Sequence, residues 1–77
     1  MNLDSKLQTL IAEFFNKDIA DINIDSSKDN IEEWDSLEHI KLVLEIEENY
    51  SVKFSLDVIP NLTSVQAIQE ELNKIIL

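Results

Sequence analysis

The sequence predicts an all-helical bundle with three longer helices, one short helix and a long first loop, folded as a single domain over residues 1–77. Glycine is absent and Pro60 is the only proline, so tight hairpins that need a positive φ would depend on Asn or Asp. Apolar residues recur at helical spacing in three separate segments. With 77 residues, 44% of them hydrophobic and 29% charged, the chain can form one modest core and is not composed like a disordered segment.

The first helix is expected over residues 3–16. Its apolar positions follow the period of an amphipathic helix and are Leu3, Leu7, Leu10, Ile11 and Phe14. Asn2 and Asp4 are candidate N-caps, because a short polar side chain there can accept a hydrogen bond from an unpaired amide of the first turn. Asn16 is a candidate for the residue that ends this helix.

The second helix is expected over residues 36–50, and its apolar side chains form two stripes where a simple amphipathic helix has one. The first stripe comprises Leu42, Val43, Ile46 and Tyr50. The second stripe comprises Leu37, Ile40 and Leu44. Two interpretations are open: one stripe packs into the core while the other serves a partner, or neighbouring segments bury both stripes.

A third long helix is expected over residues 64–76, with apolar positions at Val65, Ile68, Leu72 and Ile75. Thr63 and Gln66, three positions apart, match a capping box at its start. The segment 55–59 has room for about one helical turn. Pro60 should stop that turn, because the residue before a proline is pushed out of the α region.

The connection over residues 17–35 is long for a compact domain, so it should be either functional or packed. Apolar residues are spread through it, namely Ile19, Ile22, Ile24, Ile31 and Trp34. We therefore expect the loop to lie across the helix ends and to bury side chains of its own.

The charge and the missing cysteine exclude several classes of function. Sixteen acidic and six basic residues give a formal charge of −10, which repels nucleic acids and anionic membranes and attracts basic protein surfaces. Without cysteine the chain has no disulfide, no thiolate metal site and no sulfur nucleophile, so any thiol chemistry must be imported. No apolar run is long enough for a membrane span and the N-terminus does not resemble a signal peptide, so we expect a cytoplasmic location. We also expect the protein to be a monomer.

Ser36 lies where the long loop should end and the second helix should begin, in the motif Asp35-Ser36-Leu37. Backbone amides and the helix dipole favour an anionic phosphate at such a position, so the hydroxyl is well placed for a phosphodiester. The local pattern alone favours the simpler interpretation, in which Asp35 or Ser36 serves only as an N-cap.

A longer pattern supports the first interpretation. The Asp35-Ser36-Leu37 motif is followed by the segments 45–50 (EIEENY), 52–54 (VKF) and 62–67 (LTSVQA). Together these segments resemble the acyl carrier protein family across essentially the whole chain. The three-residue motif is weak by itself, and the order of helix, short turn and Thr-Ser-Val segment makes the resemblance specific.

The resemblance implies a four-helix bundle of the acyl-carrier type and a 4'-phosphopantetheine arm, transferred from coenzyme A to Ser36 by a phosphopantetheinyl transferase. Such a protein is not an enzyme; it carries acyl groups as thioesters to ligases, acyltransferases or synthases with basic docking patches. The residues that would face those partners are Asp35, Leu37, Glu38, Ile40, Lys41, Leu44, Glu47 and Glu48. The residues that would line the acyl pocket are Leu42, Val43, Ile46, Phe54, Leu62 and Ile68.

Two positions depart from the family pattern. A glycine is common before the Asp-Ser-Leu motif, whereas this chain has Glu33 and Trp34 there, and we expect Trp34 to pack against the bundle. Lys41 stands where carriers of general fatty acid biosynthesis usually have a carboxylate. A dedicated pathway, such as specialised lipid, polyketide, siderophore or surface-sugar acylation, is therefore an alternative to fatty acid biosynthesis.

Calcium binding is a second candidate function. The loop residues Asp21, Asn23, Asp25, Ser27, Asp29 and Glu32 have the spacing of ligands in an EF-hand. Ser26, however, takes the position at which the sharp turn of that loop needs glycine, and Lys28 takes a position that is usually apolar. The alternative is a solvated acidic loop that holds divalent ions loosely, and we expect no defined metal site.

Two further alternatives concern the second helix. An enzyme could use Ser36 as the nucleophile and His39, the only histidine, as the base, but the sequence has no glycine elbow and no evident oxyanion hole. We expect His39 to lie instead on the core-facing side of the helix. An unmodified helical adaptor, which binds partners through its second apolar stripe, is the remaining alternative.

Overall fold

The computed structural model describes residues 3–76, so Asn2, one of the two candidate caps of the first helix, lies outside the described residues. The helical elements are α1 (Ser5–Phe14), η1 (Ile19–Asp21), α2 (Ser36–Tyr50), η2 (Ile59–Asn61) and α3 (Val65–Ile76), where η denotes a 3₁₀ helix. The described residues contain no strand, which confirms the predicted all-helical class. None of the described helices combines the length and the apolar character that a bilayer span requires.

The helix α1 ends in the way that its sequence suggested. Asn16 has a φ of 56° and is therefore left-handed. The amide of Asn16 donates to the Glu13 carbonyl (3.2 Å), and the amide of Lys17 donates to the Ala12 carbonyl (2.8 Å). This pair of bonds is the Schellman arrangement, which satisfies carbonyls that a helix end leaves unpaired. Asp4 is the residue before the helix, but its side chain makes no capping hydrogen bond.

The helix α2 spans the predicted residues 36–50. Asp35 is its N-cap, and the Asp35 carboxylate accepts a 2.8 Å hydrogen bond from the Glu38 amide. At the other end Ser51 is left-handed, with a φ of 54°. Among the described residues, Asn16 and Ser51 are the two with positive φ, so a serine as well as the expected asparagine takes this role in a chain without glycine.

The short helical segment extends further along the chain than predicted, and Pro60 does not stop it. The structure has a turn over residues 56–58 followed by η2, which contains Pro60 at its second position. The amide missing from a proline needs no acceptor in the first turn of a helix, and its fixed φ suits that turn. The predicted turn within residues 55–59 is present, because the Val58 amide donates to the Ser55 carbonyl (3.1 Å). The prediction that Pro60 ends it is wrong.

The start of α3 also differs from the prediction. The helix begins at Val65, and Ser64 caps it by accepting a 3.1 Å hydrogen bond from the Ala67 amide. The predicted capping box of Thr63 and Gln66 is wrong, because the Gln66 side chain points along the helix to Glu70 instead.

A pairing between distant segments shifts this cap by one residue. Ser27 and Ser64 form an isolated antiparallel bridge. Its hydrogen bonds join the Lys28 amide to the Thr63 carbonyl and the Val65 amide to the Ser26 carbonyl, each at 2.9 Å. Thr63 is thereby held in the loop, and the long first loop is attached to the start of α3.

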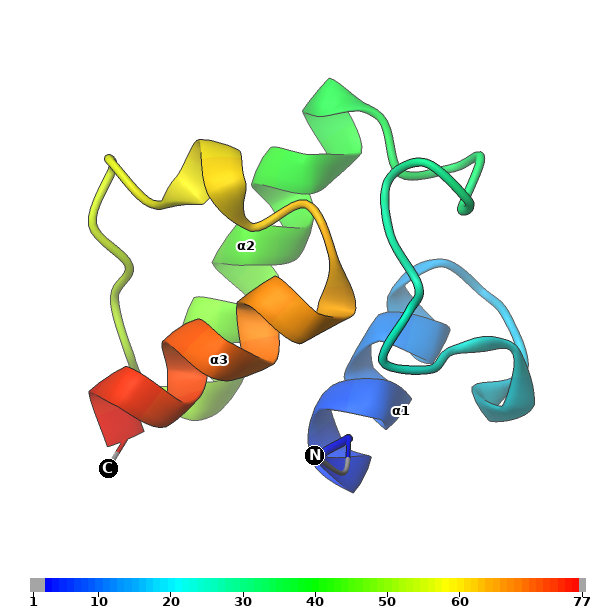
Figure 1. The fold of residues 1–77 in the computed structure, drawn as a ribbon, viewed down its shortest axis with the longest axis horizontal. Helices are drawn as coiled ribbons and strands as arrows, with labels where there is room; N and C mark the ends of the chain where they lie inside the picture. Colours follow the sequence, from blue (N-terminus) through cyan, green and yellow to red (C-terminus); the bar gives the residue numbers. More distant parts are fainter. Residues whose placement is uncertain (1–2, 77) are drawn as a thin grey trace.

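The loop over residues 17–35 is packed, as expected. Ile22, Ile31 and Trp34 are buried, whereas Ile19 is 49% exposed. The Gln8 side chain of α1 donates to the carbonyls of Ile19 (3.0 Å) and Ile22 (2.8 Å) and fixes the loop beside the helix. Figure 1 shows this loop next to α1, on the side where α2 and α3 begin.

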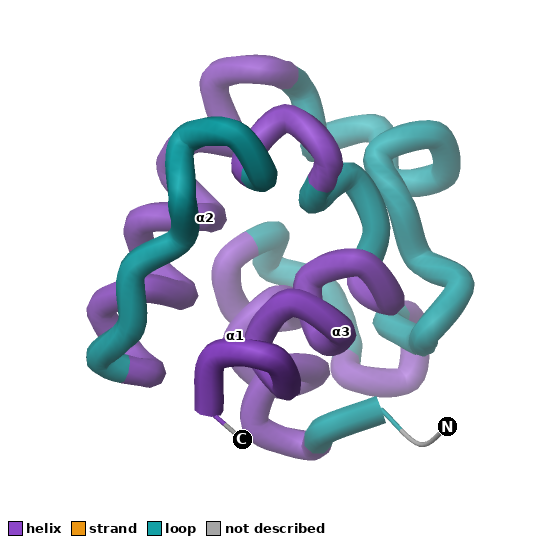
Figure 2. The backbone as a smooth tube through the Cα atoms, turned by 60° about the vertical axis from the view of Figure 1, so that its left-hand side comes forward, coloured by secondary structure: helices purple, strands orange, loops and turns teal. Residues whose placement is uncertain are grey.

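One hydrophobic core joins the helices and both long connections. Its buried apolar residues are Leu7, Ile11, Ala12, Phe15, Ile22, Ile31, Trp34, Leu42, Val43, Ile46, Phe54, Leu62, Val65, Ile68 and Leu72. Figures 1 and 2 show that the segment after α2 runs back alongside this helix, so that η2 lies beside its N-terminal half. This return places residues 53–60 alongside α2, with Phe54 beside Glu47 and Ile59 beside His39 near the start of the helix.

Candidate functional site

Ser36 is exposed and is the first residue of α2. Asp35 acts as the N-cap, so the Ser36 hydroxyl is not the group that caps the helix. The aspartate is therefore the residue that caps the helix, and the serine next to it faces solvent. An exposed primary alcohol at the positive end of a helix dipole suits a phosphodiester link.

A buried hydrogen-bonded cluster lies directly below this site. The Trp34 indole N–H donates to His39 Nδ1 (3.0 Å), and His39 Nε2 lies 2.8 Å from the Ile59 carbonyl oxygen. The two rings are stacked, with centroids 6.0 Å apart. Because the indole can only donate, Nδ1 must accept, so the imidazole proton is on Nε2 and is donated to Ile59.

This cluster bears on the enzyme alternative. His39 is buried on the core side of α2, as expected. Both of its ring nitrogens are hydrogen bonded to Trp34 and Ile59. A histidine in this arrangement has no nitrogen left to accept the proton of the Ser36 hydroxyl, so the geometry of a Ser–His pair is absent from this site.

The two apolar stripes of α2 have different environments. Leu42, Val43 and Ile46 of the first stripe are buried. Leu37, Ile40 and Leu44 of the second stripe are 62%, 55% and 59% exposed. The interpretation in which both stripes are buried is therefore wrong. The helix presents an apolar surface to solvent directly after Ser36.

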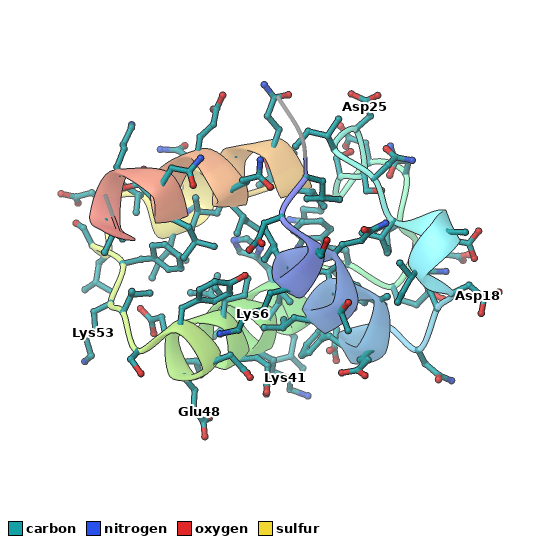
Figure 3. The ribbon with its side chains drawn as sticks, turned by 90° about the horizontal axis from the view of Figure 1, so that it is seen from below. Lys6, Asp18, Asp25, Lys41, Glu48 and Lys53 are labelled. Atoms are coloured by element: carbon teal, nitrogen blue, oxygen red, sulfur yellow. The ribbon has the colours of Figure 1, made fainter. Side chains whose placement is uncertain are left out.

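Charged side chains flank this exposed stripe. Lys41 Nζ lies 3.5 Å from Glu38 Oε1, and both groups remain partly accessible. Figure 3 shows Lys41 and Glu48 projecting from the outward side of α2. Asp35 is exposed as well, while Glu47 is half-buried and accepts a 2.8 Å hydrogen bond from the Phe54 amide. One oxygen of Glu47 is thus engaged within the protein.

The six residues expected to line an acyl pocket are all part of the core. Two of them, Val43 and Phe54, also line a groove of about 620 Å³ between α2 and the segment 53–60. Other apolar residues of this groove are Ile40, Leu44, Leu56, Ile59 and Pro60. The groove residues Leu56, Ile59 and Pro60 were not predicted, because no local pattern indicates that this segment folds back onto α2.

The side chains of the acidic loop are not gathered around a common point. The described residues contain no group of three or more acidic or histidine side chains arranged as ligands. Two of the oxygens with calcium-loop spacing accept backbone hydrogen bonds instead: Asn23 Oδ1 from Asp25 (2.8 Å) and Ser27 Oγ from Asp29 (3.2 Å). In Figure 3, Asp18 and Asp25 both project outward from the loop, well apart from each other.

Comparison with known proteins agrees with this site. The family model described as a phosphopantetheine attachment site matches residues 5–72. No curated protein matches the chain significantly. The matched range runs from the start of α1 into the last turns of α3 and includes Ser36 and the groove. The chain therefore belongs to the phosphopantetheine-attachment family and is a helical carrier protein for 4'-phosphopantetheine.

Proposed function

We propose that the protein is an acyl carrier protein whose 4'-phosphopantetheine is attached to the Ser36 hydroxyl. The observation that carries this proposal is the position of Ser36, exposed at the first residue of α2 with Asp35 as the cap. The attached group supplies a terminal thiol, which holds acyl groups as thioesters. This agrees with a chain that has no cysteine of its own. The protein presents the acyl group, and its partners perform the chemistry.

The interior beside Ser36 is suited to shelter an acyl chain. Ile40 follows Ser36 by four residues, so the two lie on the same side of α2, and Ile40 lines the groove. The groove volume of about 620 Å³ lies within the usual range for small-molecule sites. The buried residues below it would become accessible to an acyl chain if η2 and α2 separated, and they are Leu42, Val43, Ile46, Phe54, Leu62 and Ile68.

The outward face of α2 is suited to bind partner enzymes. The exposed Leu37, Ile40 and Leu44 supply apolar contacts next to Ser36. Carboxylates around this stripe and the formal charge of −10 complement a basic docking patch and accelerate encounter with it. These partners are a phosphopantetheinyl transferase and acyl-handling ligases, transferases or synthases.

Lys41 favours a dedicated pathway over general fatty acid biosynthesis. Its ammonium group lies on the docking side of α2, where a basic partner would meet a like charge. Specialised lipid, polyketide, siderophore or surface-sugar acylation therefore fits better than service to the general synthase. A cytoplasmic location and a monomeric state remain predictions from the sequence.

The test of this function is site-specific loading. Incubation with coenzyme A and a broad-specificity phosphopantetheinyl transferase should raise the mass by one phosphopantetheine. Ser36→Ala should abolish the increase and keep the helical circular dichroism spectrum. Ser5→Ala is a matched control, because Ser5 is also an exposed first residue of an α-helix and follows an aspartate N-cap. A wild-type mass that several transferases leave unchanged, or loading of Ser36→Ala, would contradict the proposal.

A further inference from the structure

His39 connects two segments that lie on opposite sides of it in the sequence. On one side is Trp34, two residues before Ser36, whose indole donates to Nδ1. On the other side is Ile59, twenty residues later, whose carbonyl accepts from Nε2. The Trp34 ring is itself fixed by the Phe15 ring, 5.7 Å away. The orientation of the imidazole is therefore determined from both of its nitrogens.

The Ile59 carbonyl of η2 accepts two hydrogen bonds. It accepts the 3.1 Å hydrogen bond from the Leu62 amide that closes this 3₁₀ turn, and it also accepts the bond from His39. Ile59 and Pro60 form one wall of the groove, and Ile40 and Leu44 of α2 form the opposite wall. Their separation depends on how η2 is held against α2, and His39 makes a side-chain hydrogen bond between these two elements.

We propose that His39 is a positioning residue, which holds η2 against α2 and thereby determines the lengths of acyl chain that the groove shelters. The inference rests on the proposed function. A chain entering between Ile40 and Ile59 displaces the η2 wall, and the bond from Nε2–H to the Ile59 carbonyl opposes that displacement. Short chains fit beside the intact bond, and longer chains must stretch or break it.

Two substitutions separate the hydrogen bonds of the imidazole. In His39→Gln the amide nitrogen lies near the position of Nε2, so it can still donate to the Ile59 carbonyl. In His39→Asn the amide oxygen lies near the position of Nδ1, so it can still accept from Trp34 but does not reach Ile59. Trp34→Phe is a further control that removes the indole N–H and keeps an aromatic ring.

The bridge is tested first in the unmodified protein by amide hydrogen exchange. The reporting amides are those of Asn61 and Leu62, which donate to the carbonyls of Val58 and Ile59 and close the turns of η2. In His39→Asn their exchange should be about tenfold faster than in the wild type, while His39→Gln should restore most of the protection. Equal exchange rates in wild type and His39→Asn would overturn the inference without touching the proposed function.

The acyl-chain effect is tested after loading with butanoyl, octanoyl and dodecanoyl groups, with loading confirmed by mass. The readout is the shift in Tm that each chain produces relative to the same variant with a free thiol. A purely structural role would lower every Tm alike and leave the dependence on chain length unchanged. In His39→Asn we expect the largest rise in Tm to come from a longer acyl chain than in the wild type. In His39→Gln we expect the same acyl chain as in the wild type to give the largest rise.

A spectroscopic measurement on the wild type does not depend on how well the variants fold. Correlation spectra of the imidazole ring should report the Nε2-protonated tautomer, and the Nε2–H resonance should shift when long chains are attached but not when short ones are. Two results would refute the inference while leaving carrier function intact. One is an Nε2–H resonance that stays the same for all three acyl groups, and the other is a dependence of Tm on acyl-chain length that is the same in His39→Asn as in the wild type. Failure of the wild type to load would refute the proposed function and this inference with it.

Discussion

The Tyr50 hydroxyl donates a 2.7 Å hydrogen bond to the Asp4 carboxylate and joins the last residue of α2 to the residue before α1. Lys6 Nζ lies 4.4 Å from the centre of the Tyr50 ring, in the geometry of a cation–π contact. The Asp4 amide donates to Gln69 Oε1 of α3 at 2.6 Å. The three long helices are therefore tied together around Asp4, at the end of α2 that lies away from Ser36.

Tyr50→Phe should lower the free energy of unfolding by about 1 kcal/mol, because it removes a hydrogen bond to a charged acceptor that is partly accessible to water. Urea unfolding followed by circular dichroism measures this change. Asp4→Asn is a useful control, because the amide oxygen can still accept from the tyrosine. Equal stability of Tyr50→Phe and the wild type would show that this bond contributes nothing net.

The same contact predicts a dependence on alkaline pH. Burial of the ring, and then the hydrogen bond to the negative Asp4, raise the pKa of the Tyr50 hydroxyl in the folded protein. The unfolded chain ionises near the ordinary value of about 10. Above that pH the unfolded state loses its proton first, so the stability falls as the pH rises. Wild type should lose more stability than Tyr50→Phe between about pH 9 and pH 11, and parallel curves would contradict this assignment.

Ser51→Gly should stabilise the protein by about 0.5 kcal/mol. Ser51 has a φ of 54°, which costs a serine more than a glycine, and the greater entropy of glycine in the unfolded chain offsets part of the gain. Asn16→Gly is the matched control, because asparagine adopts the left-handed region more readily and should gain less. Thermal unfolding of both variants tests this order, and a destabilised Ser51→Gly would refute it.

Lys41→Glu should turn a poor substrate of general fatty-acid enzymes into a better one, mainly through faster association at low salt. The Lys41–Glu38 pair is exposed and contributes only about 0.3 kcal/mol, so stability should change little. The measurement is the steady-state kcat/KM with a general malonyl transferase or ketosynthase over a range of salt.

The control for this prediction is Lys74→Glu. Lys74 also pairs with a glutamate three residues away, but on α3, and its replacement changes the net charge equally. A rate increase in Lys41→Glu alone assigns the effect to the docking face. Equal increases in both variants would assign it to net charge, and no increase in either would remove Lys41 from the explanation of partner choice.

Calcium should bind weakly and without a conformational switch. Asn23 and Ser27 use their side-chain oxygens to hold turns, and the described residues present no cluster of ligands. Millimolar calcium should raise Tm modestly by screening the charge of −10, and Asp25→Ala should leave that effect almost unchanged. Sub-micromolar affinity in calorimetry, lost in Asp25→Ala, would establish the calcium-binding alternative instead.

The sequence by itself determined the helical class, and it predicted the position of the candidate site. The period of the apolar residues predicted both ends of each long helix to within two residues of the observed bounds. The bounds of α2 were predicted without error. Local chemistry was sufficient here, because helix periodicity, an aspartate cap and the Asp35-Ser36-Leu37 motif all act within a few residues. The family match over residues 5–72 agrees with that motif.

Only the tertiary structure decided the features that depend on contacts between distant segments. The choice of the buried stripe on α2 required the positions of the surrounding elements, which periodicity does not contain. The cap of α3 moved from Thr63 to Ser64 because the loop at Ser27 pairs there. The groove and the bond from His39 to Ile59 exist because the chain after α2 folds back onto it, and no local preference specifies a contact across twenty residues.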